Sequence, residues 1–279
     1  MRVRFPQLAL LLLVTGSLSA AADDSAAQPE PPPAHEIIAK AVAWAKWHRE
    51  QQFYKCWTFE HLNTTHKLNE ADAVQSTETR RFKAYPLSGE QFYEMVRRDG
   101  EPLSASDRRK EEKRRREFVE KAEQKTPKGG GNDGEDDSEF EFDRELVSRY
   151  RAEVAGMEEI AGRLAYVLRF EPKDGPLPVR RRTDHALNRS HGKLWIDSKE
   201  FVVLQVEFEL MEPVRMWGGI LGSLSRLRGR LTLTELGGGA WHYKDLDLYM
   251  KGRVLIKPFH QDMRLEWRNF QTVETPTGP

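Results

Sequence analysis

The side chains most able to do chemistry in this sequence are eight histidines, one cysteine and many carboxylates. The histidines are scattered, and no pair has a metal-ligand spacing such as H-x-x-x-H on a helix. His61 and His66 are an odd number of residues apart, so in a regular strand they point to opposite faces. Cys56 stands alone, which excludes an internal disulfide and a cysteine-rich zinc site. Its setting in FYKCWTF predicts a buried thiol in a strand. We expect no metal site.

No motif for a nucleophile or for phosphate binding accompanies these residues. The run GGILGSLS carries Ser223 and Ser225, but it lacks the strand–serine–helix context of a nucleophile elbow. It also lacks the Lys-Ser/Thr ending of a phosphate loop. No carboxylate stands alone in an apolar run, the setting in which an acid or base acquires a raised pKa. The sequence therefore favours a protein that is not an enzyme and needs no cofactor.

The first residues have the pattern of a secretory signal peptide. Arg2 and Arg4 precede a short apolar core, and small residues near positions 21–22 fit the cleavage rule. We expect a signal peptide over 1–22, a disordered lead-in rich in proline and alanine over 23–34, and a mature protein in the periplasm. No later apolar run reaches the roughly 18 residues of a membrane span. Basic and acidic residues balance at 44 each, so a nucleic-acid partner is not expected.

The elements that must position any site are mostly strands. In FVVLQVEFELM, residues 201–211, apolar side chains alternate with Gln205, Glu207 and Glu209, and the run MRLEWRNF, 263–270, alternates in the same way. We expect about ten such strands in an antiparallel meander with one buried face. Before them, residues 35–51 repeat apolar side chains at helical spacing, which predicts an amphipathic helix that packs on the sheet.

A charged insertion, 104–140, interrupts the meander. Its first part is helical by propensity, and Ser104 or Ser106 can cap it. Phe118, Val119 and Ala122 are its apolar docking residues. The following TPKGGGNDGEDDSE has the composition of an acidic linker. A solvated helix with a loop and a partner-docking arm both fit this composition.

The segment VRRRTDHALNRSHGK, 179–193, is predicted to be a basic loop. A solvated hairpin loop and a site for a phosphate or lipid headgroup, held by charge-assisted hydrogen bonds, both fit it.

Two hairpins resemble those of the LolA-like outer-membrane lipoprotein-sorting superfamily, which includes lipoprotein carriers and a periplasmic envelope-stress sensor. YRAEVAGMEEIAGRLAYVLRFEPK, 150–173, is similar to a strand–turn–strand unit of that family, and GKLWIDSKEFVVLQVEFEL, 192–210, is similar to its Leu-Trp-Ile-Asp hairpin. An aspartate at a strand end can cap a turn, and a tryptophan can anchor a layer. The residues that carry this structural motif are Gly156, Gly162, Trp195 and Asp197.

The resemblance implies a mainly β fold with some α-helix. The sheet would be strongly curved and antiparallel, an incomplete β-barrel of about ten or eleven strands, with helices covering its concave face. One domain would span 35–273, including the charged insertion. Because the concave face receives acyl chains in the carriers, the resemblance implies a non-catalytic lipid-binding protein whose partner is an acyl chain, a lipid or a lipoprotein, as in a transport carrier. The alternative on the same scaffold is an envelope protein–protein interaction or stress-sensing module.

The most apolar run of the mature chain is VRMWGGILGSLSRLRG, 214–229. Because Pro213 cannot donate to a strand ladder, the preceding strand should end there. The apolar residues that follow recur at the spacing of a short helix with one apolar side. A lid over the concave face and a crossover that completes an ordinary core both fit. For the lid, the expected ligand-binding residues are Met216, Trp217, Ile220, Leu221 and Leu224.

Overall fold

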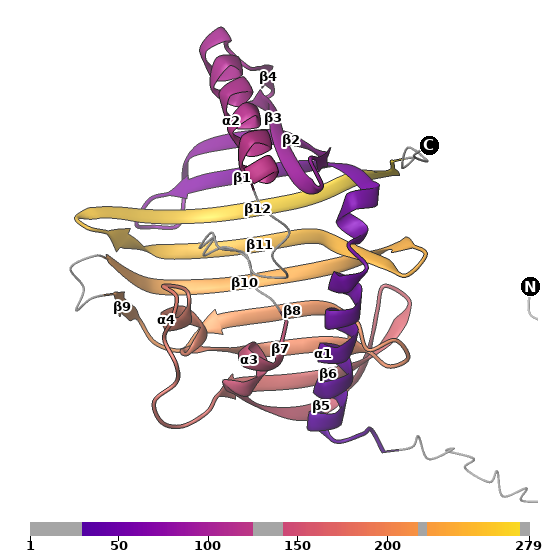
Figure 1. Cartoon of the computed structure of the whole chain (residues 1–279). Helices are drawn as coiled ribbons and strands as arrows, with labels where there is room; N and C mark the ends of the chain where they lie inside the picture. Colours follow the sequence, from indigo (N-terminus) through magenta and orange to yellow (C-terminus); the bar gives the residue numbers. More distant parts are fainter. Residues whose placement is uncertain (1–29, 125–141, 217–221, 274–279) are drawn as a thin grey trace, which may run out of the picture. The chain divides into compact units, whose positions relative to one another are not determined.

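The computed structural model describes residues 30–124, 142–216 and 222–273 (Figure 1). The predicted signal peptide, most of the lead-in and the predicted acidic linker lie outside these ranges. The helices are α1 (Ala34–Glu50), the 3-10 helix η1 (Phe53–Cys56), α2 (Ala105–Gln124), α3 (Arg144–Ser148) and α4 (Asp184–Leu187). The strands are β1 (Trp57–Leu68), β2 (Val74–Leu87), β3 (Glu90–Arg98), β4 (Glu101–Pro102), β5 (Tyr150–Ile160), β6 (Arg163–Pro172), β7 (Ser190–Asp197), β8 (Val203–Leu210), β9 (Val214–Met216), β10 (Gly222–Gly237), β11 (Ala240–Val254) and β12 (Lys257–Thr272).

Within the described residues, these twelve strands form one antiparallel sheet. Its order is β4-β3-β2-β1-β12-β11-β10-β8-β7-β6-β5, and β9 pairs with β10 outside this path. The two edge strands, β4 and β5, do not pair with each other, so the sheet stays open as an incomplete, curved barrel. The predicted mainly β antiparallel fold is confirmed. The strand number exceeds the predicted ten or eleven because β4 and β9 are too short to show alternation.

Helix α1 lies across one face of the sheet, near one end of the strands (Figure 1). Its apolar stripe is buried as predicted, since Ile37 and Ala41 are 0% and 1% exposed and pack with Leu168 and Ile196. At its other end, the ring of Trp44 meets Trp241 edge-on at 6.4 Å. The predicted amphipathic helix is therefore confirmed, and it fixes which face of β6 and β7 is the inner one.

The segment after α1 differs from the prediction at Cys56. The chain turns at Gln52, which has a positive φ of 52°, and η1 then occupies the residues expected to begin the first strand. Strand β1 starts only at Trp57, which leaves Cys56 free and exposed. The prediction of a buried thiol was wrong because this short helical turn was not visible in the alternation pattern.

The two hairpins that carry the family resemblance have well-bonded turns. Asp197, only 2% exposed, accepts hydrogen bonds from the backbone N–H groups of Lys199 (2.9 Å) and Glu200 (2.6 Å) and from Arg163 Nε (2.9 Å). Burial alone would raise the pKa of Asp197, but the Arg163 guanidinium and these N–H groups more than offset it, so the pKa is lowered. Trp195 is buried, and its Nε1 donates to Glu158 at 2.8 Å.

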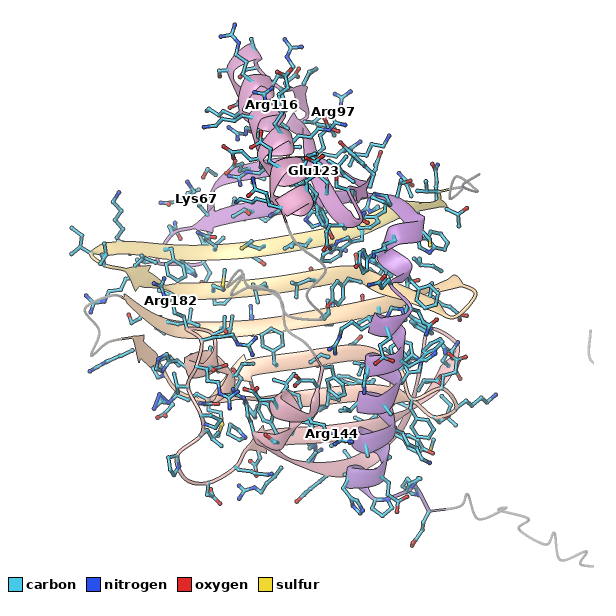
Figure 2. The ribbon with its side chains drawn as sticks, in the orientation of Figure 1. Lys67, Arg97, Arg116, Glu123, Arg144 and Arg182 are labelled. Carbon is cyan, nitrogen blue, oxygen red and sulfur yellow. The ribbon has the colours of Figure 1, made fainter. Side chains whose placement is uncertain are left out.

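The charged insertion begins as the predicted helix, α2. Ser104 Oγ accepts a hydrogen bond from the backbone N–H of Asp107 at 3.1 Å, so Ser104 acts as the expected cap. Glu111 Oε1 accepts from the backbone N–H of Met95 at 3.0 Å, and the Phe118 ring lies 5.0 Å from Phe92. Charged side chains such as Arg116 project from the rest of α2 (Figure 2). The helix therefore covers the backbone of β3 near the sheet edge, which protects that edge from pairing with other chains.

Candidate ligand-binding face

The strand register places one aliphatic side chain from each of seven neighbouring strands in a single row. Residues that pair directly across strands point to the same face of a sheet. Because Leu168 and Leu194 pack with α1, this row lies on the inner face. We call it the aliphatic ladder, and its members from β5 to β12 are Val154, Leu168, Leu194, Val206, Leu231, Leu246 and Leu265.

A second apolar row lies beside the ladder on the same face, two residues along each strand. Its members are Phe170, Gly192, Phe208, Gly229, Leu248 and Met263. A Cβ atom on Gly229 would lie 2.4 Å from Cζ of Phe208, so the glycine lets that ring lie over the backbone of β10. The two rows together form a low, continuous apolar surface across the sheet.

Helix α1 covers only one end of the ladder. Leu168 and Leu194, which pack with α1, are 0% and 8% exposed. From Val206 through Leu231 and Leu246 to Leu265, the ladder side chains are half-buried. Covering such apolar surface lowers the free energy of the system, so this part of the inner face suits an apolar ligand.

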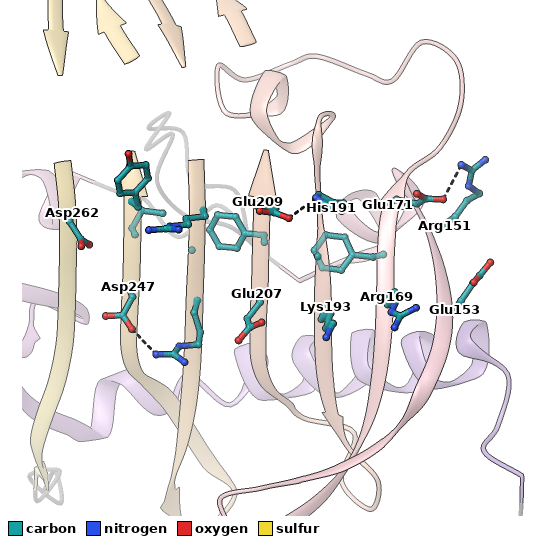
Figure 3. Close-up of a pocket in the computed structure, with 18 residues that line it drawn as sticks. Arg151, Glu153, Arg169, Glu171, His191, Lys193, Glu207, Glu209, Asp247 and Asp262 are labelled. Carbon is teal, nitrogen blue, oxygen red and sulfur yellow. Dashed lines mark hydrogen bonds and ion pairs between the residues drawn. The ribbon is translucent and has the colours of Figure 1, made fainter. Parts of the chain in front are cut away.

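The opposite face of the same strands is charged. A row displaced from the aliphatic ladder by one residue runs Arg169, Lys193, Glu207, Arg230, Asp247 and Arg264. The first five of these side chains, Arg169 to Asp247, line a hollow of about 820 Å³ with their neighbours (Figure 3). The residues of this face pair with one another, as in Arg230–Asp247 at 3.2 Å and His191–Glu209 at 3.0 Å. We interpret this face as a hydrated surface whose charged side chains pair with one another.

An aromatic cluster near the end of the sheet contains two histidines. The His61 ring lies 4.8 Å from Trp267, and the His242 ring lies 4.5 Å from Phe59. Burial lowers the pKa of both His61 and His242 to about 4, because an imidazolium is poorly solvated there. Both rings are therefore neutral at pH 7 and serve as packing groups. Among the described residues, no group of three or more His, Cys, Asp or Glu side chains is placed to hold a metal ion.

The structure places two of the five predicted lid residues. Met216 lies in β9, and Leu224 lies in β10, where it pairs with Val214 and Gly252. Trp217, Ile220 and Leu221 lie outside the described residues. The prediction of a short helix was wrong at both ends of the segment, because Val214–Met216 and Gly222–Leu224 satisfy their backbone groups by pairing as strands. Leu224 shares the face of Leu248 through its partner Gly252, so it lies on the inner face beyond the second apolar row.

The ladder residues beyond Leu194 were not predicted as a site. The alternation of Val206, Leu231 and Leu246 was visible in the sequence, but it showed only that each strand has an apolar side. Their assembly into one row depends on the strand order, in which β8 pairs directly with β10 although β9 lies between them in the sequence.

The comparisons with known proteins give similarity to solved structures alone. No protein-family model matches the sequence, and no curated protein matches it. A putative outer membrane lipoprotein-sorting protein domain from Vibrio parahaemolyticus is 13% identical at a TM-score of 0.37, with 87% of this chain and 94% of that chain covered. A DUF1329-family protein from Desulfovibrio piger is 12% identical at a TM-score of 0.36, with 85% and 93% covered.

A LolA-superfamily protein from Nitrosomonas europaea is 13% identical at a TM-score of 0.33, with 88% of this chain and 96% of that chain covered. These structures include members of the superfamily that the two hairpins resemble. The similarities concern the backbone. In the part of the chain that the structure describes, no helix is long and apolar enough to cross a membrane.

Proposed function

We propose that this protein is exported to the periplasm and binds an acyl chain, of a lipid or a lipoprotein, along the aliphatic ladder. The observation that carries the proposal is the change in burial along the ladder, from closed under α1 at Leu194 to half-buried from Val206 to Leu265. A row of aliphatic side chains that no polar group interrupts matches the chemistry of a hydrocarbon chain. The signal-peptide pattern supports export.

The dimensions of the row fit such a ligand. Val206 to Leu265 spans four neighbouring strands, and three inter-strand spacings of about 4.8 Å give roughly 14 Å. Burying ten methylene groups contributes about 8 kcal/mol at about 0.8 kcal/mol each. Lost translational and conformational freedom offsets part of this gain, so we expect dissociation constants no tighter than micromolar. Weak, reversible binding of this kind suits a lipoprotein carrier that must release its cargo.

The test uses purified full-length mature protein and dansyl-labelled undecanoic acid as the probe. The double variant Leu231→Asn, Leu246→Asn places two amides on the open part of the ladder, and it should abolish the probe's fluorescence increase. The matched control, Glu207→Gln with Arg230→Gln, changes the charged face of β8 and of β10, the strand that also carries Leu231, and it should bind the probe normally.

Circular dichroism establishes that both double variants are folded before the probe is added. Native mass spectrometry of protein prepared from the periplasm should also show a co-purified lipid. Equal probe binding by native and ladder-variant protein would contradict the proposal. Absence of both probe binding and co-purified lipid would make the envelope interaction module the better account.

A further inference from the structure

Exposed apolar side chains from several separate loops lie at one end of the sheet. Because neighbouring strands are antiparallel, β1, β6, β8 and β11 all end there, beside β9 and α4 on the left of Figure 1. Large apolar side chains exposed at this end are Val74 (58%), Val179 (50%), Met211 (56%), Val254 (55%), Leu255 (54%) and Ile256 (90%). The last three are consecutive at the β11–β12 hairpin, and we call them the apolar tip.

The residue types of the apolar tip are unusual for a tight hairpin turn. Val254 pairs with Lys257, which leaves Leu255 and Ile256 as a two-residue loop. Such loops favour Asn-Gly or other glycine-containing pairs, because they need positive φ angles. Leu255 has a φ of 53°, and Ile256 exposes 90% of its surface. Where a sequence breaks a local folding rule without a packing gain, the residues are expected to serve a function.

Basic residues surround the tip. Arg253 and Lys257 flank it in the chain, and Arg215 and Arg226 are exposed on the adjoining strands β9 and β10. Lys67 and Arg182 lie toward the same side of the sheet (Figure 2).

Two acidic groups near this end lie against basic side chains. Glu70 pairs with Lys251 at 2.7 Å, and Asp72 lies 2.9 Å from His260 Nε2. This end therefore combines protruding apolar groups with a basic surround.

We propose that the apolar tip inserts into the interface of an anionic lipid bilayer and docks the sheet by this end. A small apolar protrusion with flanking cations suits the boundary between headgroups and acyl chains. A protein partner is the weaker match, since a stable interface buries about 800 Å² on each side, whereas this tip is a convex group of three side chains. The proposal does not depend on acyl binding by the aliphatic ladder.

The test is flotation of the full-length mature protein with vesicles of phosphatidylethanolamine and phosphatidylglycerol, and with vesicles of phosphatidylcholine alone. The native protein should float with the anionic vesicles, and added salt should reduce the bound fraction because charge attraction is screened. The variant Leu255→Asn, Ile256→Gly installs a favoured turn, so it should fold at least as well while losing tenfold or more in vesicle affinity. The control Leu164→Asn changes a side chain that is 47% exposed at the opposite end, and it should float like native protein.

Results of two kinds would overturn the proposal. One is a native protein that stays unbound, or a tip variant that floats as well as native protein. The other is sedimentation showing that the tip variant abolishes self-association, which would make a second copy of this chain the occupant of the tip. Probe binding to the ladder, measured on the same samples, should be unchanged in the tip variant, so failure of the two proposals is distinguishable.

Discussion

Truncation of Leu246 and of Leu194 to alanine should separate a ligand surface from an ordinary core. Both side chains belong to the aliphatic ladder, and both changes remove the same atoms. Leu194 lies under α1 and is 8% exposed, whereas Leu246 is half-buried. The two variants therefore differ in what the side chain touches, not in chemistry.

The structure gives opposite expectations for stability and for binding. A buried leucine replaced by alanine costs about 2–5 kcal/mol, so Leu194→Ala should lower the free energy of unfolding by this amount. Leu246→Ala should cost roughly half as much, because part of its surface is already hydrated. Against an acyl chain, Leu246→Ala removes contacts worth about 1 kcal/mol, which weakens the probe about fivefold. Leu194→Ala should leave probe affinity within about twofold of native, since α1 already covers this side chain.

Urea denaturation supplies the unfolding free energies, and fluorescence titration with the dansyl-labelled acid supplies the affinities. The opposite result would be a Leu246→Ala variant that loses as much stability as Leu194→Ala and binds the probe with unchanged affinity. That result would mean that the ladder is a filled core along its whole length.

Three further predictions concern pH, a buried ion pair and the sheet edge. His61 and His242 have folded-state pKa values of about 4 against about 6.5 in the unfolded chain, which therefore binds more protons between these values. The free energy of unfolding should consequently fall as the pH drops from about 6.5 to 4, by up to about 3 kcal/mol per histidine. Urea titrations at pH 7 and 4.5 should show a shallower fall in His61→Gln, and an unchanged slope would refute the assignment. Arg149→Met removes the buried guanidinium that lies 3.2 Å from a carboxylate oxygen of Asp184, which is 0% exposed and keeps only backbone N–H donors and the more distant Arg181. This should cost about 3–5 kcal/mol by thermal denaturation, and a native-like melting temperature would count against a buried pair. Glu111→Ala leaves a backbone N–H of β3 without its acceptor, so it should cost about 1–3 kcal/mol and speed tryptic cleavage of α2; native-like cleavage would show that this contact does not hold the helix.

The fold class could be predicted because most strands are recognisable from the local pattern of apolar and polar residues. Over 204–210 in β8 and 263–268 in β12, apolar and polar side chains alternate, as is typical of strands with one packed face. Helix α1 was equally visible from its apolar stripe. The region 214–229 was misread because glycines and apolar residues at mixed spacing fit a short helix as well as two paired strands, and only the pairing of Leu224 with Val214 decides between them.

The candidate face could not be predicted, because it depends on which strands pair and in which register. Strand β1 pairs with β12, about two hundred residues later in the chain, and no local pattern encodes that contact. Simple counting also fails at bulges. The odd separation of Tyr243 and Leu246 predicts opposite faces, yet a register shift pairs Tyr243 with Leu233 and Leu246 with Leu231, which places both on one face.

Methyl NMR of selectively labelled protein titrated with a saturated fatty acid would test acyl binding most directly. We expect chemical-shift changes at the methyl groups of Val206, Leu231, Leu246 and Leu265, with little change at Leu168 and Leu194 beneath α1. Shifts confined to other parts of the chain, or no shifts at millimolar fatty acid, would contradict it.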